Sequence, residues 1–337
     1  MKKYTFILLI AILACFFNTV KAIAQPEKIP EKIWFTIKDG LDNQSFMNTI
    51  ENNTSLFLTA CNEAILKNKK PDFSSDLFAK NSKSQVMSFW ETSPMYCSKM
   101  YISEKCLKRS SGGYQVRNIP IFIPGAPEES QNQEIVINYT VDGKIDNIAI
   151  SVEETRYKEI LEDYSSVEDL TRRQIILDFL ENFRTAYNTK DLKYIGSIFS
   201  DQALIITGKV VKQAQTKDQA INRLLGSEKI VYITQTKPEY IQNLKSTFSK
   251  NKYIDVEFED IEVVRHPKND KLYGVTLKQK WGSSTYNDTG YLFLMIDFKD
   301  ETHPMIHVRT WQPAQFKGEE LSKDKIFKLN DFNIQNM

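Results

Sequence analysis

The segment from residue 272 to residue 311 reads LYGVTLKQKWGSSTYNDTGYLFLMIDFKDETHPMIHVRTW. It contains three runs in which apolar and polar residues alternate, at residues 272–281, 290–298 and 305–311. Two short polar turns separate the runs. Alternating runs joined by short turns are typical of consecutive antiparallel strands with one buried face. The segment therefore predicts the centre of an antiparallel sheet.

Upstream of this predicted sheet, the chain favours helices. Residues 175–187 place apolar side chains at helical spacing, and Asn188-Thr189-Lys190-Asp191 ends that helix. Helices followed by consecutive strands favour an α+β domain. The predicted order is a helix at 175–187, a helix at 192–199, a strand at 203–211, helices at 217–225 and 239–248, and a strand at 253–264.

The first half of the chain repeats this plan in outline. Residues 46–67 have helical periodicity, and an Asp142-Gly143 turn joins the last two apolar runs, which is a strong hairpin signal. Such parallels between the halves suggest a repeat. We expect a short helical segment at 76–80, then strands at 85–90, 95–102, 114–123, 134–139 and 145–152.

The predicted domain plan follows from these patterns. Residues 25–44 look like a lead-in, and the charged stretch 153–173 is expected to be a solvated boundary between the halves. The expected parts are a signal peptide at 1–24, a first unit at 45–152, a second unit at 165–315 and a C-terminal tail at 316–337.

Two motifs carry a resemblance to the nuclear transport factor 2-like (SnoaL-like) superfamily. One is the helix break at 188–191, and the other is the step from Phe199 to Ala203. The resemblance covers residues 170–315 well and 46–152 in outline. It implies two tandem cone-shaped units, each with helices and a curved antiparallel sheet, of which the first is degenerate.

The same resemblance leaves the activity open. The segments 278–294 and 307–313 also resemble uncharacterised exported proteins of Bacteroidetes. The superfamily contains polyketide cyclases, ketosteroid isomerases, dehydratases and many non-catalytic binding modules. Fold alone does not choose among these functions.

The N-terminus predicts export. Lys2 and Lys3 precede an apolar run, and Ala22-Ile23-Ala24 then forms a small-x-small cleavage site before Gln25. We expect cleavage near Ala24 and location in the periplasm or outside the cell. The alternative interpretation of this apolar run is a membrane anchor, but the run is short for a transmembrane span. Lipidation at Cys15 is a second alternative, because residues 12–15 loosely resemble a lipobox.

Composition excludes several function classes. Beyond residue 24, 41 lysines and arginines stand against 43 acidic residues, so no basic field predicts binding to nucleic acid. No later run is long enough to predict a membrane span. Three cysteines remain, of which Cys97 and Cys106 are near enough in sequence to form a disulfide, while Cys61 fits a buried helix position. Their spacing matches no zinc motif, and the sequence predicts neither a metal nor a cofactor.

The last strand carries the main candidate ligand-binding residues. Strand alternation places His307, Arg309 and Trp311 on one face. A titratable ring, a fixed cation and an aromatic wall together suit an anionic or planar ligand. The alternative is that His307 and Arg309 are ordinary polar groups of an outer face and Trp311 caps an apolar edge.

Asp297 is the candidate general base. It shares its strand face with Tyr291, and a carboxylate beside aromatic side chains can have a raised pKa, as in the isomerase members that the chain resembles. The alternative is that Asp297 caps the turn that follows it. His307 is the second candidate for a catalytic role.

Tyr273, Gln279 and Trp281 share one face of their predicted strand, while Lys278 and Lys280 lie on the other. Tyr273, Trp281 and Tyr291 are therefore added to the candidate ligand-binding residues. Trp281 is equally suited to the core. His303 and His307 have a four-residue spacing, but Pro304 and the strand pattern argue against a metal site.

The sequence favours an exported, non-catalytic module of the cell envelope that binds a small molecule or an envelope protein. The alternative is a lyase, isomerase or hydrolase that acts on a small molecule in the second cone. The two hypotheses differ in whether a titratable group points into a cavity. The sequence does not identify the ligand, the oligomeric state or the envelope partners.

The export prediction has a direct test. Protein recovered from the native cell envelope should begin near Gln25, because a signal peptidase cleaves after small residues such as those at 22 and 24. N-terminal sequencing or intact-mass measurement reads this terminus. A chain that begins at Met1, or at a lipidated Cys15, would contradict it.

Overall fold

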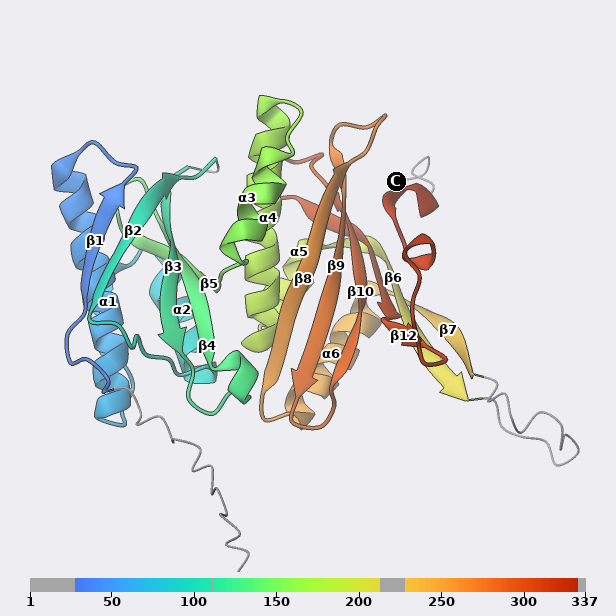
Figure 1. Cartoon of the computed structure of the whole chain (residues 1–337), viewed down its shortest axis with the longest axis horizontal. Coiled ribbons are helices and arrows are strands. Elements are labelled where there is room, and N and C mark those ends of the chain that lie inside the picture. Colours follow the sequence, from blue (N-terminus) through green and yellow to red (C-terminus); the bar gives the residue numbers. More distant parts are fainter. Residues whose placement is uncertain (1–27, 111, 213–227, 333–337) are drawn as a thin grey trace, which may run out of the picture.

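The computed structural model describes residues 28–110, 112–212 and 228–332. The predicted signal peptide and the predicted helix at 217–225 lie outside these residues. Within them, no helix is both long and apolar enough to cross a membrane. The chain forms two α+β units in tandem, which lie side by side in Figure 1 with helix α4 between them. The predicted fold class, two units with helices and antiparallel sheets, is confirmed.

The first unit packs two helices against a five-stranded sheet. The sheet has the order β1-β2-β3-β4-β5, and only the β1–β2 pair is parallel. Its apolar core includes Phe57 of the first helix and Ile137 of the sheet. The elements are β1 (Trp34–Asp39), α1 (Gln44–Leu66), η1 (Ser75–Leu77), α2 (Ser82–Thr92), β2 (Tyr101–Lys108), β3 (Tyr114–Phe122), η2 (Glu128–Ser130), β4 (Asn132–Tyr139) and β5 (Ile145–Ile150).

Helix α1 closes the free edge of this sheet. An edge strand presents unpaired N–H groups, which invite pairing with another chain. Three side chains at four-residue spacing on α1 accept hydrogen bonds from alternate N–H groups of the β1 edge and the residue before it. The bonds run from Ile33 to Thr59 Oγ1 at 3.0 Å, from Phe35 to Ser55 Oγ at 3.0 Å and from Ile37 to Glu51 Oε1 at 2.8 Å. The outward N–H groups along this stretch of the edge are therefore satisfied within the first unit.

Three predictions for the first unit are wrong. The strand predicted at 95–102 shares only its last two residues with the observed strand β2 (Tyr101–Lys108). Residues 85–90 form part of helix α2 rather than a strand, because Val86, Phe89 and Trp90 follow the helical spacing and are all buried. The lead-in at 25–44 contains strand β1, whose inward residues Phe35 and Ile37 join the core. Short runs carry too few repeats for periodicity to separate a helix from a strand.

The cysteines of the first unit are all buried and free. Burial raises the pKa of Cys106 to about 12, so its thiol stays protonated at neutral pH. The pairing considered for Cys97 and Cys106 does not occur here. Cys61 lies in the core, as its helix position predicts.

The second unit is larger. Its six-stranded sheet has the order β7-β6-β11-β10-β9-β8, in which only β6 and β11 are parallel. Strand β7 was not predicted. The elements are α3 (Glu154–Glu162), α4 (Val167–Asn188), α5 (Leu192–Ile198), β6 (Phe199–Lys212), β7 (Glu228–Gln235), α6 (Lys237–Lys250), β8 (Ile254–Arg265), β9 (Leu272–Ser283), β10 (Asp288–Asp297) and β11 (Met305–Pro313).

The sheet of the second unit has an inner and an outer face. On the inner face, side chains such as Leu277, Leu292 and Leu294 pack in one core with helices α4 and α6. On the outer face, Phe293 and Met295 form a second, smaller core. Alternate residues of β10 thus enter different cores, which confirms the alternation predicted for this strand.

The C-terminal segment covers the outer face rather than forming a free tail. It contains β12 (Gln315–Phe316), β13 (Glu319–Glu320), η4 (Lys323–Lys325) and η5 (Leu329–Asp331). Leu329 joins the outer core, and the ring of Phe332 stacks on Phe293 with 5.3 Å between centroids. Gln312 holds the segment by accepting from Phe327 N–H at 2.8 Å and donating to Lys325 O at 2.9 Å.

Helix α4 joins the two units. Its apolar side faces the second core, and its opposite side meets the first sheet. There Glu181 accepts from Arg117 Nη2 at 2.5 Å and from the Val152 N–H at 2.7 Å, and both charged side chains are buried. The Arg117 guanidinium also lies 3.7 Å from the ring centroid of Tyr157. The units thus share a buried polar contact.

The expectation that residues 153–173 form a solvated boundary is therefore wrong in its second half. Asp169, Arg172 and Arg173 are buried in the first turns of α4. Arg173 pairs with Asp169 at 3.2 Å, and Arg172 pairs with Glu301 at 2.7 Å. Charge density predicted solvent exposure, but these charges are satisfied within the fold.

Removing the cation at the contact between units should destabilise the chain. Arg117→Met leaves the buried Glu181 carboxylate without its partner, which typically costs about 3–5 kcal/mol. Urea denaturation of the chain measures this loss of unfolding free energy. The control Lys67→Met removes an exposed pair with Glu63 and should change stability little. Equal effects of the two substitutions would contradict a structural role for the buried pair.

Candidate functional site

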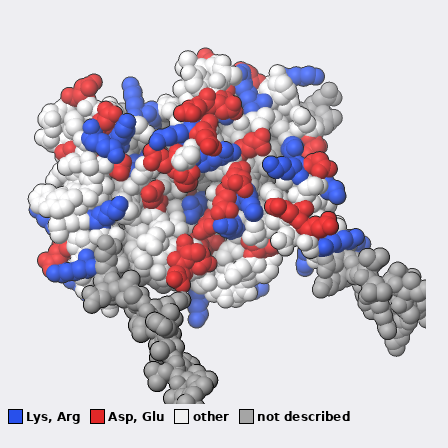
Figure 2. All heavy atoms as spheres, viewed as in Figure 1, with Lys and Arg blue, Asp and Glu red and all other residues white. Residues whose placement is uncertain are grey.

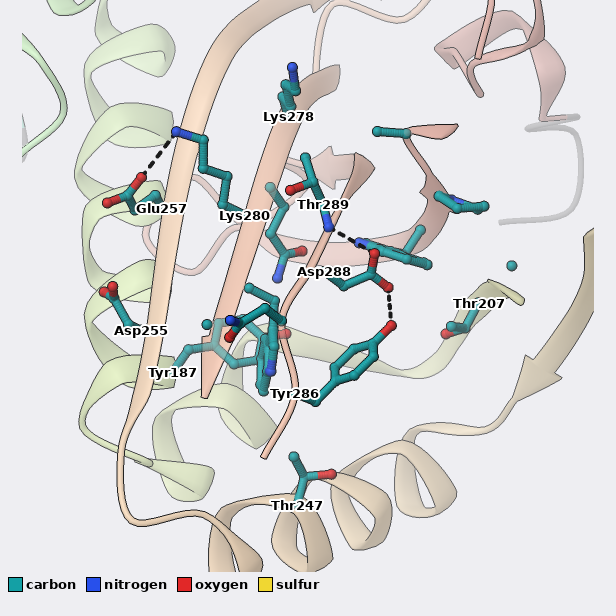
Figure 3. Close-up of a pocket in the computed structure, with 18 of the residues that line it drawn as sticks. Tyr187, Thr207, Thr247, Asp255, Glu257, Lys278, Lys280, Tyr286, Asp288 and Thr289 are labelled. Atoms are coloured by element: carbon teal, nitrogen blue, oxygen red, sulfur yellow. Dashed lines mark hydrogen bonds and ion pairs between the residues drawn. The ribbon is translucent and has the colours of Figure 1, made fainter. Parts of the chain in front are cut away.

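The second unit contains a cavity of about 1700 Å³ that opens at one end of its sheet. Strands β6, β9, β10 and β11 and helices α4 and α6 supply most of its lining. Figure 3 shows lining side chains from these elements, with Tyr187 reaching in from α4 and Thr207 from β6. Predicted ligand-binding residues Arg309, Trp311 and Trp281 all line this cavity.

Strand register explains why these residues meet. Arg309 lies opposite Leu294 of β10 and Ile205 of β6, which are inner-face core residues. Trp311, two residues further on, lies opposite Leu292 and Thr207. Side chains two apart on a strand share a face. Arg309 and Trp311 therefore both point to the inner side of the sheet.

Arg309 is a buried cation at the base of the cavity. Its side chain is 6% exposed, and its guanidinium lies 5.0 Å from the ring centroid of Tyr240. Burial opposes its charge, but the phenols of Tyr240 and Tyr187 leave its pKa above the usual value. Its Nε has no hydrogen-bond partner. Arg309 stays charged and keeps an unused donor.

Two tyrosines complete the base of the cavity. The hydroxyls of Tyr187 and Tyr240 are hydrogen-bonded to each other. Burial raises the pKa of Tyr240 well above its usual value, so this phenol remains a neutral donor. The ring of Tyr187 meets that of Trp281 edge to face at 5.8 Å. An aromatic wall thus continues from the base to β9.

Gln279 is the second polar group of the inner wall. Its side chain is 2% exposed, and its Oε1 has no hydrogen-bond partner. It lies between the inner-face residues Leu277 and Trp281, and its strand partner on β10 is Gly290. Buried polar atoms of native proteins are nearly always paired. The amide oxygen of Gln279 is therefore a buried acceptor without a partner, on a residue that lines the cavity.

Gly290 makes room for the indole of Trp311. A Cβ at this position would lie 2.4 Å from Cε2 and Cζ2 of Trp311 and 2.4 Å from the carbonyl oxygen of Gln312. The absent side chain leaves room for the Trp311 indole over β10. Gly290 thereby fixes one aromatic wall of the cavity.

The mouth of the cavity is polar and mixed in charge. Tyr286 donates to Asp288, which also accepts from the Thr289 N–H at 2.8 Å (Figure 3). Burial and the Asp288 carboxylate raise the pKa of Tyr286 to about 12. Acidic and basic side chains intermingle over β8 and β9 beside the mouth (Figure 2), where Lys280 pairs with Glu257 at 3.4 Å.

The first unit also reaches the mouth. Ser130, at the end of η2, lines the cavity and is buried. Its hydroxyl is hydrogen-bonded to Asp255 and lies 3.4 Å from Glu257 Oε1. Burial raises the pKa of Asp255, and the hydroxyl of Ser130 opposes that rise. The mouth is thus built from both units.

The prediction that His307 shares a face with Arg309 and Trp311 is wrong. The register between β10 and β11 shifts at this point, with Ile296 opposite Ile306 but Met295 opposite Val308. His307 is the extra residue of this β-bulge, so the alternation changes phase there. It lies 3.4 Å from Asp297, outside the residues that line the cavity.

Asp297 does not line the cavity either. Its carboxylate accepts from the Lys299 N–H at 2.8 Å, which is the turn-capping role that we gave as the alternative. Tyr291 points to the outer side, where its hydroxyl donates to Glu320 at 2.9 Å. Tyr273 faces inward but lies at the closed end of the core, where it donates to Asp169 at 2.8 Å.

The sequence analysis missed Tyr187 and Tyr240. Both occupy apolar helix faces, where helical periodicity predicts that an aromatic side chain is buried in the core. Their hydroxyls offered the only signal, since a buried phenol needs a polar partner. Among the described residues, no group of three or more histidine, cysteine, aspartate or glutamate side chains is placed to hold a metal ion.

Comparisons with known proteins find distant likenesses only. No family model matches the chain, and no curated protein does. Solved structures that are similar include Bd1075 of Bdellovibrio bacteriovorus, at 13% identity over 63% of this chain and 75% of that one, with a TM-score of 0.33. An NTF2-like protein of Cytophaga hutchinsonii has 15% identity over 42% of this chain and 98% of that one, with a TM-score of 0.30.

A third similar structure is ActVI-ORFA of Streptomyces coelicolor, at 7% identity over 41% of this chain and 93% of that one, with a TM-score of 0.29. NTF2-like proteins are thus among the similar structures, as the sequence resemblance predicts. The identities and TM-scores are low, and nothing about this chain is argued from these likenesses. The architecture of the chain rests on its own strand order.

Filling the space at Gly290 should disturb the cavity wall. In Gly290→Ala the new methyl group collides with Trp311, and overpacking of this kind costs about 1–3 kcal/mol. Chemical denaturation should show this loss, together with a change in tryptophan fluorescence. In the control Gly196→Ala, the nearest atom is 3.9 Å from the new Cβ. That helix substitution should stabilise the chain by roughly 0.5–1 kcal/mol. A stable Gly290→Ala with unchanged fluorescence would contradict the tight packing.

Proposed function

We propose that the chain is an exported, non-catalytic binding protein of the cell envelope whose second unit holds a small molecule. The observation that carries this proposal is the pair of incompletely satisfied polar groups, Arg309 and Gln279, buried on the inner wall of one cavity. Leaving such groups unpaired costs stability. A bound molecule that pairs with both would recover that cost.

Several carboxylates line the cavity, among them Asp255, Glu257 and Asp288, but none of them pairs with Arg309, which favours binding over proton transfer at that cation. A general base must lie within hydrogen-bond reach of the substrate. Around Arg309, the base of the cavity presents phenols and aromatic rings. The candidate base Asp297 caps a turn instead. Export rests on the N-terminal pattern of charged, apolar and small residues.

An enzyme acting in the same cavity is the second candidate, and the Tyr286–Asp288 pair favours it. A carboxylate hydrogen-bonded to a phenol at the mouth is a possible acid–base unit for a lyase, isomerase or hydrolase. In that case Asp288→Asn would abolish turnover of a bound compound, with binding retained. A binding protein would release every compound unchanged.

The proposal is tested by thermal shift with a panel of small carboxylates, amines and neutral compounds. We expect some compounds to raise the Tm of the wild-type chain. Arg309→Met should weaken their binding by about 1.5–3 kcal/mol, because a charge-assisted contact is lost. Without ligand, this variant should be at least as stable as the wild type, since the buried cation has no carboxylate to pair with.

Asp297→Asn is the matched control, because Asp297 lies on the same sheet but outside the cavity. It should leave the thermal shifts unchanged. The proposal fails if no compound stabilises the wild-type chain, or if both substitutions reduce the shifts equally.

A further inference from the structure

We infer that the chain forms a dimer in which strand β7 pairs antiparallel with β7 of a second copy. The inference concerns an interaction surface and does not depend on the proposed binding function. It rests on three observations. The other outer strands of the two main sheets have hydrogen-bond partners along their edges, β7 does not, and the sequence of β7 fits a copy of itself.

In the part of the chain that the structure describes, the two main sheets have four outer strands, β1, β5, β7 and β8. Helix α1 closes β1, as described above. Along β5, the N–H of Ile150 donates to Thr185 Oγ1 of α4 at 3.0 Å. The carbonyl of Ile145 accepts from the Ala79 N–H at 2.9 Å. Both strands of the first unit are therefore occupied within the chain.

Helix α4 closes β8, at the opposite side of the second sheet from β7. Asn188 Oδ1 accepts from the Val256 N–H at 2.8 Å, and Arg184 Nε donates to the carbonyl of the same residue at 2.8 Å. Further along this edge, Arg173 Nη1 donates to the carbonyl of Val263 at 3.2 Å. Three of the four outer strands thus have partners beyond their own sheet.

Strand β7 has no such partner among the residues that the structure describes. It pairs with β6 alone, in a continuous register from Glu228 to Gln235 that contains no bulge. Residues 230–235 read IVYITQ, without a charge, a glycine or a proline. Natural edge strands are protected against pairing by charges, prolines or bulges. An unprotected edge rich in β-branched residues is therefore suited to pair with another strand.

The side chains of β7 also leave apolar surface to cover. Tyr232 is 44% exposed on the outer face, where its ring contacts Phe327 at 5.5 Å between centroids. Ile233 is 46% exposed on the inner face, where it lines the cavity. Figure 1 places β7 on the side of the second unit away from the first unit, so the first unit does not block this edge. A strand paired with β7 would cover part of both side chains.

Symmetry restricts how two copies of β7 can pair. A two-fold axis perpendicular to the sheet makes the two strands antiparallel and keeps their inner faces on one side. Because opposite residues then share a face, the axis must pass through a residue rather than between two. An axis through Val231 would oppose Lys229 to Ile233, a cation to an apolar side chain. An axis through Tyr232 avoids this mismatch.

The register centred on Tyr232 matches the chemistry of each pair. Apolar or β-branched residues meet each other, and the cation meets a neutral amide, so no like charges are opposed. The pairs are Tyr232 with Tyr232, Val231 with Ile233, Ile230 with Thr234, and Lys229 with Gln235. Every contact except the central one is made twice, as in the isologous dimers that are commonest among homo-oligomers. This self-complementarity favours a second copy over a strand of another protein.

The dimer would bring two cavities together. Ile233 and Gln235 of β7 line the cavity. Since the axis keeps both inner faces on one side, the two cavities would flank the paired strands on the same side of a continuous sheet. Val231 of the second copy would lie beside Ile233 at the cavity wall.

Sedimentation velocity of the chain from Gln25 at about 10–100 μM tests for the dimer, because edge pairing buries a modest area and such interfaces are often weak. We expect a dimer. Ile233→Lys should raise the dissociation constant by more than about tenfold, since each copy would bury a lysine without a partner. The matched control is Val264→Lys. Val264 is 45% exposed on β8, the edge that α4 closes, so this variant should dimerise as the wild type does.

A cysteine at the axis tests the register. In Tyr232→Cys, the two new thiols would lie opposite each other with Cα atoms about 4.5–5.5 Å apart, which suits a disulfide. Mild oxidation should therefore link the copies covalently. In the control Thr234→Cys, the two thiols would be offset by roughly 13 Å along the strands and should stay unlinked. The native Cys61, Cys97 and Cys106 are buried and should not compete.

A wild-type chain that stays monomeric at these concentrations would overturn the inference and leave a strand of another protein to occupy the edge. A dimer that Ile233→Lys leaves intact would also overturn it, as would equal linking of Thr234→Cys and Tyr232→Cys. The wild-type mass and the cysteine links do not depend on the folding of the lysine variant, so a misfolded variant would not hide the answer.

Discussion

The requirement that helix α4 bury two opposite faces governs the rest of this structure. One face carries Ile176, Leu180 and Phe183 into the second core. The other carries Glu181, whose carboxylate is satisfied by Arg117 and a backbone N–H of the first unit. A helix with one apolar face could stand at a surface. The charged residue on the opposite face requires a partner, and the first sheet supplies it.

The cavity depends on the same helix. Tyr187 lies in the last turn of α4, and its ring and hydroxyl connect Trp281 with Tyr240. Arg309 then lies among phenols rather than carboxylates. Arg117, Arg172 and Arg173 each pair with a carboxylate within the fold, whereas Arg184 and Arg309 are buried without such an ion pair among the described residues. The two units also meet at its mouth, where Ser130 bonds to Asp255. A molecule in the cavity would therefore sit beside the contact between the units.

The outer face of the second sheet is apolar, and the C-terminal segment covers it. Phe293 and Met295 would be exposed on a bare sheet, and the C-terminal segment covers them through Leu329 and Phe332. In the first unit, the side chains of α1 close the β1 edge. The covered apolar face and the paired edge N–H groups would otherwise favour association with another chain.

The sequence by itself determined the long strands of the second unit, the break after α4 and the inward direction of Arg309, Trp311 and Trp281. These are local properties, because alternation and helical spacing are set by backbone geometry over a few residues. Only the tertiary structure decided that His307 leaves the cavity face, since a bulge depends on how β11 pairs with β10. It likewise decided that Asp297 caps a turn, that Tyr291 meets the C-terminal segment and that Tyr187 and Tyr240 join Arg309. Those outcomes rest on contacts between residues distant in sequence, which no local pattern encodes.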